Sequence, residues 1–123
     1  MKHVLLLASF LAFAHTASAQ VPLDPRQPFS VLTVLRLKPG THQKFYQEVR
    51  KIVAFSRAEP GNLAWYVQQS VEDPSEIVFF TRWVDQAALD WHLNAGPVAR
   101  YIERSNALLA RPVRLLKYRP LDL

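Results

Sequence analysis

Two residues of this chain have side chains that could do chemistry together, Trp83 and His92, nine positions apart. Imidazole changes its protonation state near neutral pH, so His92 is the strongest candidate for a general base. The indole of Trp83 is a large flat ring that can pack against another aromatic ring. If both side chains face one small pocket, a base lies beside the wall of a ring-binding site.

The elements predicted around these residues should bring them together. Trp83 ends an apolar strand, and Thr81 shares its face of that strand. Asp85 is a good N-cap for the helix that follows. On that helix, His92 lies three residues after Leu89 and borders the apolar stripe. We therefore expect the strand face and the helix stripe to meet at Trp83 and His92.

The rest of the chain completes a regular order of elements. The pattern predicts strands over residues 29–37, 63–70, 77–83 and 113–118, and helices over residues 41–59, 85–95 and 97–109. Thr41 is expected to be the N-cap of the first of these helices. The last two helical segments form one helix interrupted at Gly96-Pro97. The order β-α-β-β-α-β is ferredoxin-like, an α+β fold with both helices on one face of a four-stranded antiparallel sheet.

The other face of this sheet is predicted to be apolar as well. Leu32 and Val34 alternate with the inward residues of the first strand, as Val78 and Phe80 do on the third. A solvated face normally carries polar residues at such positions, and an uncovered apolar patch is unusual. We therefore predict a homodimer that packs sheet against sheet.

The beginning of the chain predicts export. Lys2 and His3 precede an apolar stretch of 11 residues, and Ala17-Ser18-Ala19 is typical of a cleavage site. A membrane-spanning helix needs about 20 apolar residues, so we expect a signal peptide over residues 1–19 and no membrane anchor. Because the chain has no cysteine, a lipid-modified form is excluded. The expected product is periplasmic or secreted.

Composition limits the classes that remain. Residues 20–28 are predicted to be a flexible leader, and residues 29–120 are enough for one domain. The net charge is +5, but the arginines are scattered along the sequence, so no nucleic-acid partner is expected. Beyond the leader the histidines are His42 and His92, without a metal-ligating motif, so no metal site is predicted. Glu59 is interpreted as part of a helix-ending turn.

Four short motifs occur in a fixed order along residues 31–120. They are Lys38-Pro39-Gly40, Glu59-Pro60-Gly61, Glu72-Asp73-Pro74, and Trp83 followed by Asp85-Gln86-Ala87-Ala88-Leu89 and His92-Leu93. In this order and at these spacings they resemble the antibiotic biosynthesis monooxygenase family. The resemblance implies a dimeric ferredoxin-like fold, the dimeric α/β-barrel type.

Within this family the chain is most similar to the quinol monooxygenase branch. Trp83, His92 and Tyr101 stand where that branch has the same residues. Two positions depart from it, because the branch usually has Glu in place of Thr81 and often has a second His in place of Pro97. The resemblance implies oxidation of a hydroquinone or polyphenol by O₂ without a cofactor.

Other branches of the family match less well. Phe79, Leu89 and Glu103 occupy polar positions of the branch that forms polyketide quinones. Thr33 and Tyr101 stand where the haem-degrading branch needs an Asn and an axial His, so haem ligation is not expected. Phe79 and Leu89 are then expected to line the substrate as apolar residues.

Oxygenation without a cofactor requires a base and a dry cavity, because the substrate itself supplies the electrons. His92 is the expected base, Trp83 the ring wall, and Thr81 or Tyr101 the hydrogen-bonding anchor for a phenolic oxygen. The alternative is a non-catalytic dimeric module that binds a small aromatic ligand. The loss of Glu at Thr81 favours the module, whereas the retained His92 and Tyr101 favour the enzyme.

Overall fold

The computed structural model describes residues 24–123. The predicted signal peptide and the first residues of the predicted leader lie outside this range. The elements, in chain order, are β1 (Phe29–Arg36), α1 (His42–Arg50), α2 (Val53–Ala58), β2 (Asn62–Gln69), β3 (Glu76–Trp83), α3 (Gln86–Asn94), α4 (Gly96–Asn106) and β4 (Arg114–Tyr118). Within residues 24–123, none of the helices is long and apolar enough to cross a membrane.

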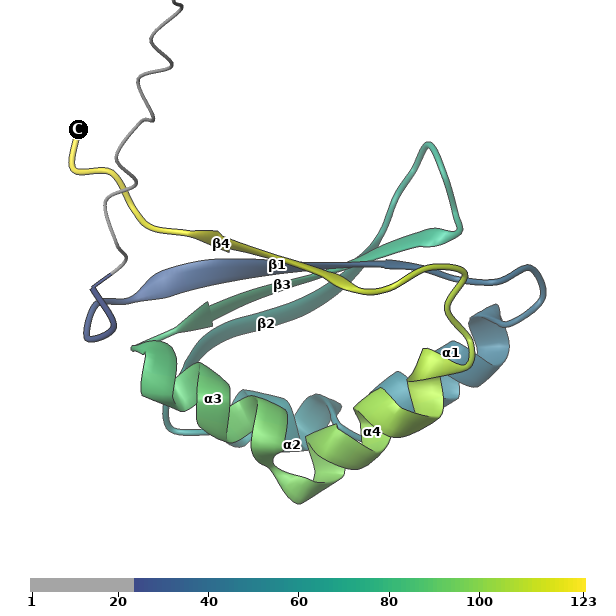
Figure 1. Cartoon of the computed structure of the whole chain (residues 1–123), viewed down its shortest axis with the longest axis horizontal. Coiled ribbons are helices and arrows are strands. Elements are labelled where there is room, and N and C mark those ends of the chain that lie inside the picture. The colour runs from purple at the N-terminus through teal and green to yellow at the C-terminus, as the bar shows by residue number, and fades with distance from the viewer. Residues whose placement is uncertain (1–23) are drawn as a thin grey trace, which may run out of the picture.

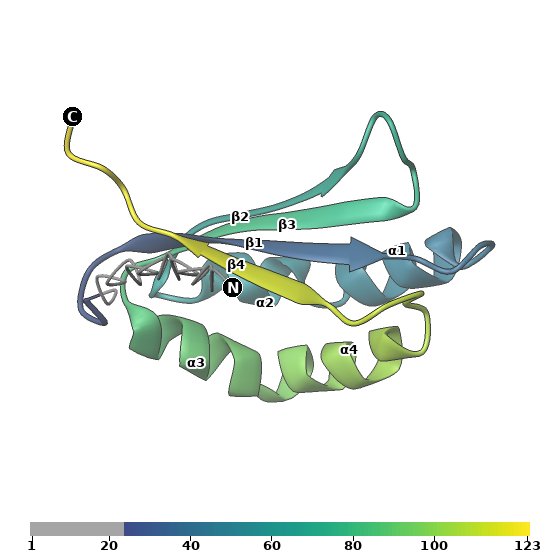
Figure 2. The same cartoon turned by 45° about the horizontal axis from the view of Figure 1, so that its top comes forward.

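The four strands form one antiparallel sheet in the order β2-β3-β1-β4. The helices form a second layer on one face of this sheet (Figures 1 and 2). The two central strands are therefore β1 and β3, and β4 lies at an edge. This arrangement confirms the predicted α+β, ferredoxin-like fold.

The long helix predicted over residues 41–59 is in fact two helices, α1 and α2. At the junction the backbone N–H of Lys51 donates to the carbonyl of Glu48, and that of Ile52 donates to Val49. Both bonds span three residues instead of four, so the last turn of α1 is tightened and the chain changes direction. The junction keeps Ile52 buried at 2% exposure.

The two predicted helix caps differ in outcome. The side chain of Asp85 accepts a hydrogen bond from the backbone N–H of Ala88 at 2.8 Å, as a capping residue does. Thr41 is the N-cap residue of α1, but its hydroxyl donates to the carbonyl of Lys38 at 2.7 Å and accepts no bond from the helix N–H groups. The prediction is therefore confirmed for Asp85. For Thr41 the N-cap position is confirmed, because its carbonyl accepts from the backbone N–H of Phe45 at 2.9 Å, but its side chain makes no capping bond.

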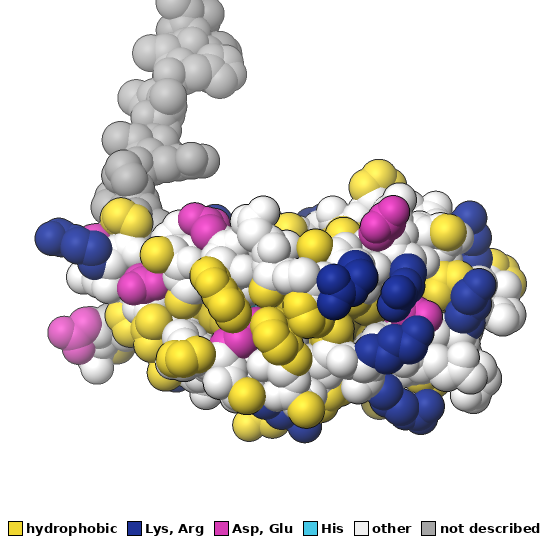
Figure 3. Space-filling model, turned by 90° about the horizontal axis from the view of Figure 1, so that it is seen from below, with side chains coloured by type: hydrophobic (Ala, Val, Ile, Leu, Met, Phe, Trp, Pro, Cys, Tyr) yellow, Lys and Arg dark blue, Asp and Glu magenta, His cyan; other side chains and the backbone are white. Residues whose placement is uncertain are grey.

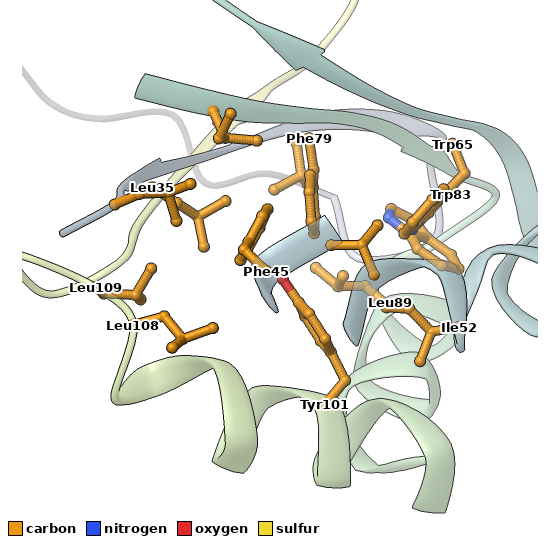
Figure 4. Packing of buried hydrophobic residues seen from close by; sticks show 14 of the residues in the cluster. Leu35, Phe45, Ile52, Trp65, Phe79, Trp83, Leu89, Tyr101, Leu108 and Leu109 are labelled. Carbon is orange, nitrogen blue, oxygen red and sulfur yellow. The ribbon is translucent and has the colours of Figure 1, made fainter. Parts of the chain in front are cut away.

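The core lies between the helix layer and the inner face of the sheet (Figure 4). On β3 the inward residues are Ile77, Phe79, Thr81 and Trp83, and all four are buried. The period of two along a strand explains this alternation. Trp83, at 1% exposure, is the largest fully buried side chain among the described residues.

The outer face of the sheet carries a continuous apolar row. Strand register places Tyr66, Phe80, Leu32 and Leu116 side by side across all four strands. Tyr66 stacks on Phe80, with ring centroids 6.5 Å apart, and is still 56% exposed. The remaining three are half-buried, and all the helices lie on the opposite face.

Charge is unevenly distributed over the helix layer. Seen from that side, apolar side chains gather towards the end with α3, and Lys and Arg gather where α1 and α4 lie (Figure 3). Glu48 lies among these cations, 2.7 Å from the Lys51 amine and 3.8 Å from the Arg104 guanidinium. The hydrogen bond from Lys51 and the nearby cations lower the pKa of Glu48.

Candidate functional site

A cavity of about 180 Å³ lies between the inner face of the sheet and the helices α3 and α4. Its lining is largely aliphatic and aromatic. Every residue predicted for the site lines it, namely Phe79, Thr81, Trp83, Leu89, His92 and Tyr101. The fold thus brings residues from β3, α3 and α4 around one enclosed space.

The rings of Trp83 and His92 are in contact at one end of this cavity. Their centroids are 4.6 Å apart and their planes are inclined by 41°. Asp85 starts α3 almost immediately after β3 ends, so the chain turns back over the sheet. His92 follows seven residues later, two helical turns along, and this spacing places its ring on the indole.

Glu59 holds the imidazole of His92 in place. Nδ1 of His92 lies 3.0 and 2.9 Å from the two carboxylate oxygens of Glu59. His92 and Glu59 are only 7% and 6% exposed. An ionised carboxylate can only accept hydrogen bonds, so Nδ1 carries the hydrogen and donates it. The neutral ring then has its lone pair on Nε2, which is the nitrogen that can act as a base.

The structure corrects the interpretation of Glu59 as a purely structural turn residue. A carboxylate that orients the His92 imidazole is present, although it comes from the turn after α2 and not from position 81. The sequence did contain a signal: Glu59 caps the C-terminal end of α2, where the helix dipole disfavours a carboxylate. A carboxylate at such a position indicates a partner elsewhere in the fold.

Thr81 fixes the other ring at this end of the cavity. The indole Nε1–H of Trp83 donates to the hydroxyl oxygen of Thr81 at 2.9 Å. The indole of Trp83 is therefore held by a hydrogen bond at its N–H group and by contact with the His92 ring. Because Thr81 accepts in this bond, its own hydroxyl hydrogen remains available for a ligand oxygen.

Tyr101 contributes a hydroxyl that has no partner. Its side chain rises from α4 towards the sheet and packs between Phe45 and Phe79, with centroid distances of 6.4 and 6.2 Å (Figure 4). Tyr101 is 6% exposed, and within residues 24–123 its buried oxygen has no hydrogen-bond partner. Burial raises the pKa of Tyr101, and the nearby Ser105 hydroxyl, which is not in hydrogen-bonding geometry, offsets this only in part, so the phenol stays neutral and can donate. An unpaired buried hydroxyl costs about 1–3 kcal/mol, which a ligand oxygen would recover.

A second, shallower hollow lies behind the same wall. Glu59 and Trp83 line it together with Trp91, and its volume is about 280 Å³. Trp91 is 58% exposed and stacks on Phe55 with ring centroids 6.1 Å apart. Trp91 thus points away from the cavity that His92 lines.

The described part of the chain does not gather metal ligands. Over residues 24–123, no group of three His, Cys, Asp or Glu side chains could hold a metal ion. His42, the other histidine in this range, hydrogen-bonds the carbonyl of Pro74 at 2.8 Å and lies outside the cavity lining.

Comparison with known proteins gives a consistent result. A family model described as "Antibiotic biosynthesis monooxygenase" matches residues 28–104. "Putative monooxygenase YcnE" of Bacillus subtilis is 25% identical over 83 residues, 68% of this chain and 87% of that protein. The Synechocystis protein sll1783 is 27% identical over 92 residues, and the match spans 75% of this chain and 63% of that protein.

Solved structures share the fold. The structure of Rv0793 from Mycobacterium tuberculosis superposes with a TM-score of 0.73 at 26% identity, covering 79% of this chain and 98% of that one. The structure described as "Putative antibiotic biosynthesis monooxygenase from Nitrosomonas europaea" reaches a TM-score of 0.75 at 18% identity, covering 82% of this chain and 96% of that one. The second likeness concerns the fold alone.

Proposed function

The chain belongs to the antibiotic biosynthesis monooxygenase family, and we propose that it is an exported, cofactor-independent monooxygenase. Its substrate in this proposal is a hydroquinone or polyphenol, and its oxidant is O₂. The observation that carries the proposal is the buried pair of His92 and Glu59 at the wall of an apolar cavity. A base held in one tautomer beside an aromatic wall fits deprotonation of a phenol.

The reaction proposed for a hydroquinone balances without a cofactor. One oxygen atom enters the ring and the other leaves as water, so the products are a hydroxyquinone and H₂O. The substrate supplies all four electrons that O₂ accepts. The protein therefore has to move protons, hold the ring and exclude water.

His92 begins this sequence by taking a phenolic proton onto Nε2. The O–H bond breaks, and the electron-rich anion adds O₂ at a ring carbon, forming a C–O bond and a peroxide. His92 returns its proton to the terminal peroxide oxygen. The ring carbon then loses its own proton as the O–O bond breaks, and the hydroxide that leaves takes up that proton as water. The carboxylate of Glu59 stabilises the imidazolium that forms between these steps.

The remaining residues hold the substrate during these steps. The phenol of Tyr101 and the hydroxyl of Thr81 each have a hydrogen available for a substrate oxygen. Trp83 supports the ring, and Phe79 and Leu89 keep the surroundings apolar. A cavity of about 180 Å³ is smaller than the pockets of about 300–1,000 Å³ that take drug-sized ligands. It suits a substrate whose reacting part is one ring.

We also propose that the protein works as a homodimer outside the cytoplasm. The support for the dimer is the apolar row on the outer face, Tyr66, Phe80, Leu32 and Leu116. A second copy packed on this row would remove it from water. The support for export is the sequence pattern of residues 1–19.

A second candidate is a non-catalytic module that binds a small aromatic compound. The unpaired hydroxyl of Tyr101 in an apolar cavity favours ligand binding whether or not O₂ reacts there. In this alternative His92 and Glu59 are a buried pair that stabilises the turn after α2.

Oxygen consumption separates the two candidates. The chain without residues 1–19 would be given a panel of hydroquinones in an oxygen electrode, beside the variants His92→Ala and His42→Ala. The proposal predicts uptake above autoxidation that is lost in His92→Ala and kept in His42→Ala. Uptake equal to autoxidation for the native chain across the panel would reject the oxygenase in favour of the binding module.

A further inference from the structure

We infer that the substrate carries an apolar tail on its ring and that this tail lies in the mouth of the cavity, between α4 and β4. This inference rests on the proposed function for the ring chemistry. It concerns a different part of the cavity, and the residues that carry it take no part in the proton transfers.

The exposure of the lining residues shows where the cavity opens. The lining residues at the reactive end, Trp83, His92 and Tyr101, are at most 7% exposed. Three other lining residues are large, apolar and open to solvent: Ile102 at 43%, Val113 at 38% and Leu115 at 49%. The mouth is therefore formed mainly by these three apolar side chains, which we call the rim, and Asn106 on α4 is the exposed polar residue of the lining beside them.

The rim lies on the two elements that flank the opening. Ile102 follows Tyr101 on α4. Leu115 is on the edge strand β4, where it pairs with Thr33 of β1 on the face that lines the cavity. Val113 comes just before β4 and shares the side-chain direction of Leu115. The rim is thus the outward continuation of the same apolar wall that surrounds Tyr101.

The size of the cavity decides what can occupy the rim. The enclosed volume suits one ring, so any longer substituent must leave through the mouth. A charged substituent would lose water against the three apolar rim residues, and the one exposed polar group of the lining, the neutral amide of Asn106, cannot neutralise a charge. An alkyl or prenyl-type chain would instead cover the rim residues and remove apolar surface from water. The rim therefore favours hydroquinones with an apolar tail over unsubstituted or charged ones.

A binding series tests this without requiring turnover. The probes are 4-alkylphenols with tails of one to five carbons, which keep the ring and one phenolic oxygen. Each methylene that is buried should lower the dissociation constant about threefold to fourfold, until the tail extends past the rim. Binding would be measured by calorimetry or by the fluorescence of the buried tryptophans.

Rim variants tie the series to this surface. Ile102→Ser and Leu115→Ser should flatten the dependence on tail length while leaving the affinity for 4-methylphenol nearly unchanged. Leu63→Ser is the matched control, because Leu63 is 50% exposed on β2 and does not line the cavity. A native series without length dependence would overturn the inference. Rim variants in which affinity depends on tail length as it does in the native chain would also overturn it. This includes the case in which Leu115→Ser dissociates a dimer but does not change that dependence.

Oxygen uptake with 2-alkylhydroquinones keeps this inference separate from the proposed function. Turnover that is equal for all tail lengths would overturn the inference that the substrate has an apolar tail. It would not contradict the proposed oxygenase activity. If the phenols bind with a dependence on tail length but the hydroquinones are not turned over, the inference of an apolar tail is supported and the proposed oxygenase activity is rejected.

Discussion

Both faces of the sheet are apolar at their centre, but their surroundings differ. On β3 the inward residues Phe79 and Trp83 alternate with the outward residues Val78 and Phe80. The inner face is covered by helices and encloses a cavity that contains polar groups, whereas the outer face is a flat apolar row with no helix on it in residues 24–123. A substitution on the inner face should therefore act through the specific contacts of that residue. A substitution on the outer row should act through the apolar area that the proposed second copy would bury.

The inner and outer faces of the sheet also differ in their polar groups. On the inner face, Thr81 pairs with Trp83 and Glu59 pairs with His92, and Tyr101 alone among the predicted site residues keeps an unpaired buried hydroxyl. Buried polar groups are normally paired, so this exception supports the proposal that a ligand oxygen binds there. The outer row contains one polar group, the hydroxyl of Tyr66, and this residue is exposed at the end of the row on the edge strand β2.

The largest effect on stability is expected from truncating the buried side chain of Trp83 on the inner face. Trp83→Ala should lower the free energy of unfolding by about 3–5 kcal/mol, because it leaves a large hole in a closed core. Urea unfolding measures this. Trp91→Ala, at a 58% exposed tryptophan, should change stability by about 1 kcal/mol or less. Equal losses in the two variants would show that the inner face is not closely packed.

A charge on the outer face should act on association and not on the core. Phe80→Asp should raise the dissociation constant of the proposed dimer at least about a hundredfold, since a buried unpaired carboxylate costs several kcal/mol. Sedimentation measures this. Val71→Asp adds the same charge at a residue that is 99% exposed in the turn between β2 and β3 and should leave association unchanged. If the native chain is monomeric at all concentrations, the proposal of a dimer formed through the outer face is wrong.

The Glu59 carboxylate should affect the inner face through its charge. Glu59→Gln keeps an acceptor for Nδ1–H of His92 but no longer stabilises the imidazolium, so oxygen uptake should fall about tenfold to a hundredfold. Glu72→Gln, the same change at an exposed residue, is the control. Unchanged turnover in Glu59→Gln would restrict Glu59 to a structural role.

The smallest change is Tyr101→Phe, which should have opposite effects on stability and on binding. Removing an unpaired buried hydroxyl should raise the free energy of unfolding by about 1 kcal/mol. The affinity for a phenol should fall about tenfold, because the ligand oxygen loses its donor. Tyr118→Phe, at a 50% exposed tyrosine, should change neither quantity. A loss of stability in Tyr101→Phe would mean that the hydroxyl has a partner in solution.

The dependence of stability on alkaline pH is an independent test of the buried Tyr101 phenol. Burial raises its pKa in the folded state, so the unfolded chain ionises first. Above about pH 10, the ordinary tyrosine pKa, the unfolded state releases this proton while the folded state keeps it, and stability falls as pH rises. In Tyr101→Phe the decline above pH 10 should be shallower than in the native chain. Parallel declines would contradict the buried, neutral phenol.

Local patterns in the sequence determined much of this protein. The order of strands and helices, the inward direction of Thr81 and Trp83, and the position of His92 on the apolar side of α3 follow from periods of two and 3.6 and from the Asp85 cap. These features depend on neighbours within a few residues, which is why periodicity predicts them. The exposed apolar residues of the outer face follow from the same alternation.

Tertiary structure decided the partners of the polar groups. Glu59 reaches His92 across 33 residues of sequence, and only the packing of the turn after α2 against α3 brings the two side chains together. The break between α1 and α2 and the free hydroxyl of Tyr101 likewise depend on how the helices sit on the sheet. Hydrogen bonds and burial between distant segments leave no period in the sequence, because they are set by the distance between surfaces and not by the spacing along the chain.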